Sequence, residues 1–154
     1  MSEPRPEQAQ EWHDDGLADT VSALEYDGGV LTFRDWNVRY DLAADNPDLG
    51  NHVPGEFGLV GIIDRYDIVA RVWEGVPETF RRVILYHEIQ EATIALGKAE
   101  DYVVGGPQIG FMPKEKAHII AERLHWEFAR THLSPAEFVE FQKWDAQLQR
   151  DGVY

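Results

Sequence analysis

The chain has 154 residues, 44% of them hydrophobic, with five Trp, seven Phe and six Tyr; this predicts one domain with an apolar core and excludes wholesale disorder. Cys is absent, which excludes disulfides and thiolate ligands, so any metal must be bound by His and carboxylate side chains. The net charge of −14, from 28 acidic and 14 basic residues, argues against nucleic-acid binding and favours a well-solvated surface, or a basic protein or peptide partner.

The first 15 residues are acidic and contain Pro, and they carry no pattern typical of a site. We expect residues 1–15 to form a flexible tail and residues 16–154 to form a single domain. The start of the chain lacks the basic residues and apolar core of a signal peptide. No apolar run reaches the roughly 18 residues of a membrane-spanning helix, so the sequence predicts a cytoplasmic protein that does not bind membranes.

Three stretches of the N-terminal half are predicted to form strands. Residues 30–40 follow a Gly-Gly pair and alternate apolar with polar side chains, which is typical of one or two half-buried strands. Residues 57–63 and 68–73 are short apolar runs, and we interpret both as strands, although the second also fits the start of a helix. Residues 45–56 are rich in turn-forming types and are expected to form a long loop.

A helix is predicted from Pro77 to about Gly97, because Pro is favoured in the first turn of a helix and Gly just after its end. Within it, Tyr86–Ala92 reads Tyr-His-Glu-Ile-Gln-Glu-Ala. His87 and Glu91 are four residues apart, so they share one face, and this is the predicted apolar face. A carboxylate that points into the protein needs a hydrogen-bonding partner or a metal ion.

A second predicted helix follows a Gly-Gly-Pro loop and repeats this spacing with His118 and Glu122. The loop allows the two helices to fold against each other, so that both pairs can surround one ion. Zinc fits best, because it accepts His and carboxylate ligands and commonly takes three of them at a catalytic site. We expect His87, Glu91 and His118 as ligands, Glu88 as general base, and Glu122 as a fourth ligand or as the partner that orients an imidazole.

Two alternatives remain at the second helix. His125 lies one turn beyond Glu122 on the same face and can replace it as a ligand. Glu115 and His118 also have the Glu-x-x-His spacing of di-iron helix bundles, which makes a dinuclear site the minor alternative, since such sites need a second pair of this kind.

At His87, Glu88 and Glu91 the chain resembles the active-site helix of the zincin metallopeptidases, in which His-Glu-x-x-His supplies two zinc ligands and a general base. Glu91 stands where that pattern has its second His, and His118 and Glu122 resemble the later helix that brings the third ligand. The resemblance implies a zinc-dependent enzyme that hydrolyses peptide or amide bonds. The chain also resembles a small bacterial protein type with His-Glu-x-x-Glu-Ala followed by Ala-His-x-x-Ala.

The last predicted helix begins with Ser134-Pro135-Ala136-Glu137, a capping box with Pro at the first helical position, and runs to about Arg150. Strands in the N-terminal half followed by helices are typical of an α+β fold. We therefore expect a small, mainly antiparallel sheet packed against three C-terminal helices.

These patterns are compatible with two functions of different classes. The first is a zinc-dependent hydrolase that cleaves a peptide or amide bond through a metal-bound water. The second is a non-enzymatic binding or regulatory module, in which the metal is structural or the His and Glu side chains form a buried hydrogen-bonded network. In the second case the acidic surface would face a basic partner. For an enzyme, specificity is expected in the loops at 45–56 and 101–111.

Overall fold

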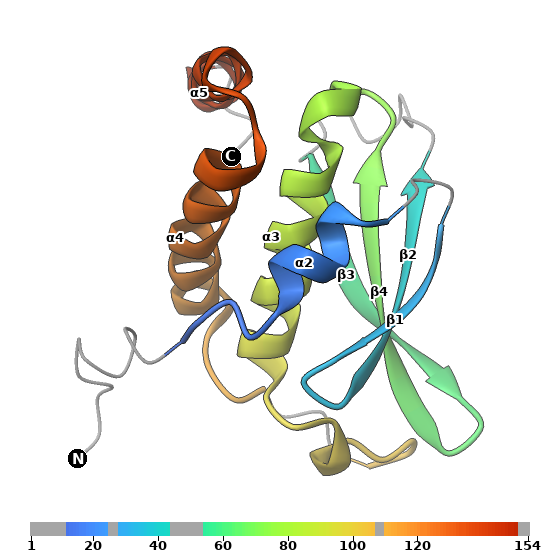
Figure 1. Ribbon diagram of the computed structural model, residues 1–154. Helices are drawn as coiled ribbons and strands as arrows, with labels where there is room; N and C mark the ends of the chain where they lie inside the picture. Colours follow the sequence, from blue (N-terminus) through green and yellow to red (C-terminus); the bar gives the residue numbers. More distant parts are fainter. Residues whose placement is uncertain (1–11, 25–27, 44–53, 107–109, 151–154) are drawn as a thin grey trace, which may run out of the picture.

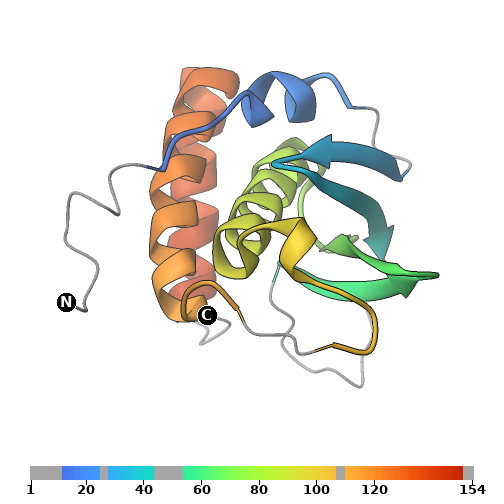
Figure 2. The same cartoon turned by 90° about the horizontal axis from the view of Figure 1, so that it is seen from below.

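The computed structural model describes residues 12–24, 28–43, 54–106 and 110–150 of the chain (Figure 1). These residues form three layers: a four-stranded sheet, the helix α3 on one face of it, and the helix α4 beyond α3. Figure 2 shows α3 between the sheet and α4. The predicted α+β fold, with a small sheet and three C-terminal helices, is confirmed.

The sheet has the strand order β1-β2-β4-β3. Its strands are β1 (Gly29–Phe33), β2 (Trp36–Ala43), β3 (Gly55–Ile62) and β4 (Arg65–Trp73). The pairs β1–β2 and β3–β4 are antiparallel hairpins, and the central pair β2–β4 is parallel. The sheet is thus mainly antiparallel, as predicted, and residues 68–73 belong to a strand rather than to the start of a helix.

The three predicted helices are present in the predicted order, and a short helix and two 3-10 turns that the sequence did not indicate accompany them in the described part of the chain. They are the short α2 (Leu17–Ser22), α3 (Arg81–Leu96) preceded by the 3-10 turn η2 (Glu78–Phe80), the 3-10 turn η3 (Ala99–Asp101), α4 (Lys114–His132) and α5 (Pro135–Arg150). The capping box of α5 is formed in both directions: the Glu137 N–H donates to Ser134 Oγ (3.1 Å), and the Ser134 N–H donates to Glu137 Oε1 (2.8 Å). None of the described helices is long and apolar enough to cross a membrane.

Helix α3 is the centre of the core. Every residue from Val83 to Ala95 is buried, because the helix contacts the sheet, α4 and α2 on different sides. The expectation of one inward face was therefore too narrow: a helix enclosed by three neighbours has no outward face over this stretch. The polar residues on every side of α3 must all find partners within the protein.

The side of α3 that faces α2 is bonded to the last residues of the predicted tail, to Asp14 directly and to His13 through Arg34. Residues 1–11 of that tail lie outside the described part, but Asp14 Oδ1 accepts a hydrogen bond from the Tyr86 hydroxyl (2.6 Å). The Arg34 guanidinium, from the β1–β2 turn, donates to Gln90 Oε1 (2.8 Å) and to the carbonyl oxygen of His13 (2.7 Å). These bonds satisfy the polar groups on that side of the helix.

Candidate metal centre

Helices α3 and α4 bring His87, Glu91 and His118 together. Glu91 Oε1 lies 2.9 Å from His87 Nε2 and 2.8 Å from His118 Nδ1, and these two nitrogens are 3.1 Å apart. The helical spacing of His87 and Glu91 places both on one face of α3. Helix α4 runs antiparallel to α3 (Figure 1), and His118, in an early turn of α4, meets both residues there. The three side chains form a group that can hold a metal ion.

The donor set and its spacing fit a small transition-metal ion. Two imidazole nitrogens and one carboxylate oxygen are ligands that such an ion accepts, and a tetrahedral ion with bonds of about 2.0–2.1 Å separates neighbouring ligand atoms by about 3.3 Å. The separations in this group are a few tenths of an ångström shorter. Small rotations of the three side chains are enough to accommodate an ion.

The electrostatics keep Glu91 ionised. Burial opposes ionisation of this carboxyl, but hydrogen bonds from His118 and His87 outweigh burial and lower its pKa to about 2. The same hydrogen bond to Glu91 raises the pKa of His118 above its ordinary value. Protons in the group therefore reside on imidazole nitrogens, and Glu91 provides a permanent negative charge beside them.

The pKa of Glu88 is shifted in the opposite direction. It is buried at 9% exposure, and burial, together with the neighbouring charge of Glu91, raises its pKa well above the ordinary value. Lys114 acts in the other direction and lowers it. Two carboxyls three residues apart on one helix thus have pKa values shifted in opposite directions, which is the separation of roles that acid–base chemistry needs.

A pocket of about 360 Å³ opens beside the group. Its walls come from the start of β3, the middle of α3 and the first turns of α4, and they include Gly55, Glu56, Glu88, Lys114, His118 and Glu122. None of the described residues of 101–111 lines it. The predicted loop at 45–56 ends two residues earlier than expected, because Gly55 and Glu56 already belong to β3; residues 44–53 lie outside the described part of the chain.

Gly55 is a residue of the site that the sequence did not indicate. A Cβ at this position would lie 2.8 Å from Ile84 Cγ2 and 2.9 Å from Glu88 Cγ. Only Gly permits this close approach of β3 to α3, which shapes the wall beside Glu88. The sequence does show a Gly at this position, but Val53-Pro54-Gly55 has the composition of a turn, and the sequence therefore predicts that Gly55 is part of a loop.

Glu122 lies at the rim rather than in the group. Its Oε2 is 3.8 Å from His118 Nε2, the ring nitrogen that points away from Glu91. Both side chains are partly exposed, at 42% for His118 and 37% for Glu122. Of the two roles predicted for Glu122, this placement fits the orientation of an imidazole better than a fourth ligand.

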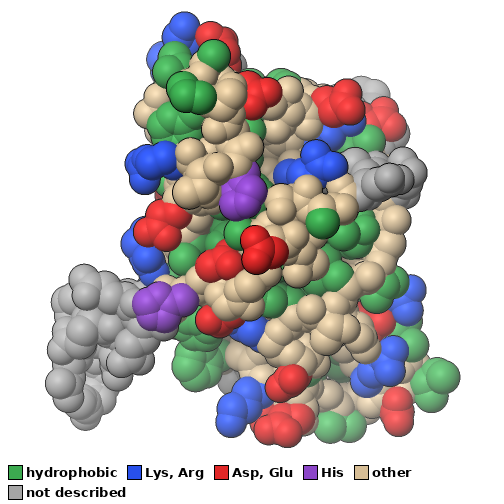
Figure 3. Space-filling view, viewed as in Figure 1, with side chains coloured by type: hydrophobic (Ala, Val, Ile, Leu, Met, Phe, Trp, Pro, Cys, Tyr) green, Lys and Arg blue, Asp and Glu red, His purple; other side chains and the backbone are tan. Residues whose placement is uncertain are grey.

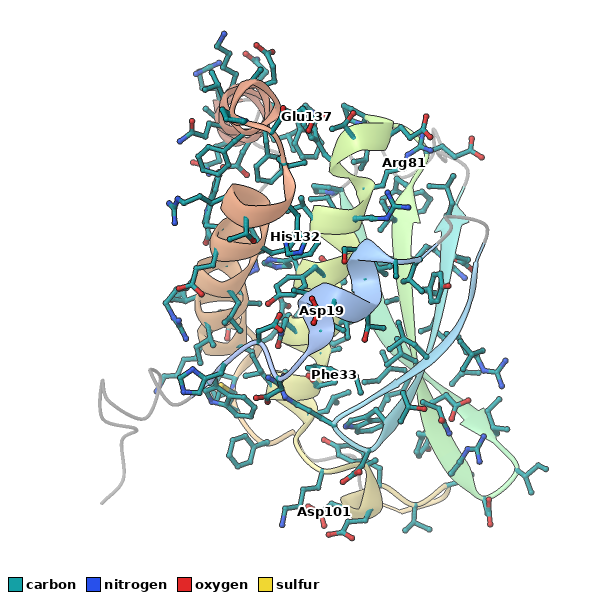
Figure 4. All side chains as sticks on the ribbon, in the orientation of Figure 1. Asp19, Phe33, Arg81, Asp101, His132 and Glu137 are labelled. Carbon is teal, nitrogen blue, oxygen red and sulfur yellow. The ribbon has the colours of Figure 1, made fainter. Side chains whose placement is uncertain are left out.

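The remaining histidines of α4 lie outside the group. His125 Nδ1 contacts His87 Nδ1 at 2.7 Å, on the side of the His87 ring away from Glu91, and burial, reinforced by the neighbouring imidazoles, lowers the His125 pKa well below its ordinary value. His132 stacks on Phe128 at the end of the helix (Figure 4). Glu115 is exposed and lines no part of the pocket, so the described residues provide no second pair for a dinuclear site.

Comparison of the chain with protein-family models, with curated proteins and with solved structures found no match. The resemblance to the zincin active-site helix therefore rests on the residues themselves. What the structure adds to it is a His–Glu–His group able to hold a metal ion.

Proposed function

We propose that the protein is a zinc-dependent hydrolase of peptide or other amide bonds, with His87, Glu91 and His118 as ligands and Glu88 as general base. The observation that carries this proposal is the compact group of three donors next to a carboxyl of raised pKa, both facing one pocket. Two His and one carboxylate are a ligand set that catalytic zinc sites use, with a position left for water.

When bound, zinc would lower the pKa of a coordinated water to about 7. The protein's own contribution is to hold and move the proton. Glu88 is buried and its pKa is raised, which brings its carboxyl closer to the neutral range in which a group both accepts and returns a proton efficiently. In the proposed reaction Glu88 takes a proton from the attacking water and donates it to the leaving nitrogen of the substrate.

The surroundings of the pocket suit a peptide in extended conformation. Strand β3 is at the edge of the sheet, and its first residues line the pocket. An edge strand has backbone N–H and C=O groups that can pair with an added strand. Besides the histidines, the described pocket walls carry Glu56 and Glu122 and one Lys side chain, Lys114, so we expect neutral or basic side chains in the substrate.

The test begins with metal content. Purified without chelators, the wild type should contain about one zinc per chain, and the His87→Ala/His118→Ala variant should contain none. Glu88→Gln should keep the zinc and lose peptide hydrolysis, because it removes the proton acceptor and leaves the ligands intact. Wild-type protein that folds cooperatively but neither contains nor takes up zinc would refute the proposal, as would a Glu88→Gln variant with full activity.

A second candidate function is supported by the hydrogen bonds of the group itself. His87 contacts Glu91, His118 and His125, and Glu91 contacts His118, all at 2.7–3.1 Å. The four side chains can therefore act as a network that fixes α3 against α4 in a binding module. The face shown in Figure 3 carries interspersed acidic and basic side chains rather than a patch of one sign. For this alternative, zinc should leave the melting temperature unchanged, whereas a zinc site should raise it.

A further inference from the structure

His125 occupies an unusual position behind the candidate ligand His87. The two Nδ1 atoms are 2.7 Å apart, and the ring centroids are 4.9 Å apart. The His125 side chain is buried at 5% exposure, and its other neighbours include the aromatic rings of Trp126 and Phe141. Its second nitrogen, Nε2, is buried without a hydrogen-bond partner among the described residues.

The direction of this hydrogen bond depends on what His87 does with its other nitrogen. His87 Nε2 is the atom that faces Glu91 and His118. A neutral imidazole that binds a metal through Nε2 carries its proton on Nδ1, and that N–H needs an acceptor. Among the described residues, His125 Nδ1 is the atom within hydrogen-bonding distance of His87 Nδ1.

We propose that His125 is a positioning residue: its Nδ1 accepts the hydrogen bond from His87 Nδ1–H and thereby fixes the ring and tautomer in which His87 Nε2 faces the metal. This inference rests on the proposed zinc site and deepens it. His125 remains neutral in this role, with its own proton on Nε2, and it does not contact the ion.

Packing alone does not explain why position 125 is a His, because its Nε2 is buried without a hydrogen-bond partner among the described residues. Burial of a polar N–H among aromatic rings without a partner is destabilising. A Phe at this position would fill nearly the same space between Trp126 and Phe141 without this cost. An imidazole here is explained by the acceptor that it offers to His87, since that acceptor is what Phe cannot supply.

The experiment measures zinc affinity in the full-length protein by competition with a chelator of known affinity. His125→Phe keeps the aromatic packing and removes the acceptor, and we expect it to weaken zinc binding about 10–100-fold, as loss of an outer-sphere partner does. His125→Asn places an amide oxygen near the position of Nδ1 and should retain affinity within a few fold. His125→Gln carries its amide one bond further, toward the position of Nε2, and should resemble the Phe variant.

Two further readouts separate positioning from packing. The melting temperature of chelator-treated His125→Phe should be no lower than that of the wild type, so that stability and zinc affinity change independently. In zinc-loaded protein labelled with ¹⁵N-histidine, a coupling across the hydrogen bond should join the two Nδ1 atoms of His87 and His125.

The outcomes distinguish this inference from the proposed function. Tight zinc binding by the wild type together with unchanged affinity in His125→Phe would overturn the role of His125 and leave the zinc site standing. Equal losses in the Asn and Phe variants would overturn it as well, since they would indicate packing alone. If His125→Phe fails to fold, the difference between Asn and Gln decides the question. A wild type that binds no zinc would overturn both proposals.

Discussion

The protein carries the same His-x-x-x-Glu spacing twice, and the two copies differ in almost every physical property. On α3, His87 and Glu91 are buried, with side chains 7% and 4% exposed, and their atoms are 2.9 Å apart. On α4, His118 and Glu122 are 42% and 37% exposed, and their contact is 3.8 Å. Spacing alone gives two residues a common helical face; the surroundings of that face decide whether they form a tight buried pair or a loose surface pair.

The difference follows from the position of each helix. Helix α3 is enclosed by the sheet, α4 and α2, whereas α4 has one side against α3 and another in water. Glu91 is therefore held between two imidazoles, while Glu122 reaches only the outer nitrogen of His118. The two pairs are joined through one shared residue, because His118 contacts Glu91 with one nitrogen and Glu122 with the other.

The largest expected effect is on zinc affinity, measured in two separate variants that each remove the carboxylate of one pair. Glu91→Ala removes a proposed ligand and should weaken binding about 100-fold or more, since each ligand carries a sizeable share of the total binding free energy. Glu122→Ala removes a partly exposed partner of His118 and should cost about 10-fold at most. Equal losses would mean that both carboxylates bind the ion, as four-coordinate structural sites do.

Lowering the pH should remove the stability that ionised Glu91 contributes to the folded protein. Its pKa falls from 4.5 to about 2 on folding, so its contribution to stability is present above about pH 4.5 and is lost as the pH falls toward 2. The shift corresponds to about 3 kcal/mol. In chelator-treated protein, urea unfolding should show Glu91→Gln less stable than the wild type near pH 5, with the gap closing toward pH 2. A gap independent of pH would contradict the low pKa.

Glu88 should impose the opposite dependence. Burial raises its pKa well above 4.5, so the folded protein binds this proton more tightly than the unfolded chain. The stability that it contributes is present below pH 4.5 and is lost as the pH rises through the folded value. Glu88→Gln, which stays neutral, should flatten this decline in chelator-treated protein. His118, whose pKa is also raised, adds its own decline only above its ordinary value of 6.5. If the decline between pH 4.5 and 6.5 persisted in Glu88→Gln, another group would be its source.

The smallest effect concerns the side of α3 that faces α2. Tyr86→Phe removes the hydroxyl that donates to Asp14, and it should lower the free energy of unfolding by about 1–2 kcal/mol. Zinc affinity should stay at the wild-type value, because the hydroxyl of Tyr86 bonds to Asp14 and Gln90 and to none of the proposed ligands. A change in zinc affinity of more than a few fold would show that the two sides of α3 are coupled.

Much of this architecture could be predicted from local signals. Pro77, Gly97 and the capping box at Ser134 located the helices within a few residues, and alternation together with two short apolar runs located the strands. The meeting of His87, Glu91 and His118 could also be predicted, since spacing placed each side chain on a face and a turn-rich loop allowed the helices to pair.

What could not be predicted depends on contacts between distant segments. The parallel pairing of β2 with β4 is set by how two hairpins dock, and no local pattern encodes it. The approach of Gly55 to Glu88 and the contact of His125 with His87 likewise arise from packing in three dimensions. Helical spacing placed His125 on the face of His118 and Glu122, but only packing against α3 shows which nitrogen of His87 it contacts.

The parallel pair β2–β4 also has a consequence for folding kinetics. Val38 pairs with Ile68, 30 residues further along the chain, and His87 meets His118 across 31 residues, whereas the hairpins β1–β2 and β3–β4 join adjacent strands. Local units form quickly, and closing the longer loop between hairpins is slower. We therefore expect the two hairpins to form first, and the parallel pair and the three donors on α3 and α4 to come together later. A folding intermediate that holds both hairpins but has not yet assembled the three donors is the state that this order of assembly predicts.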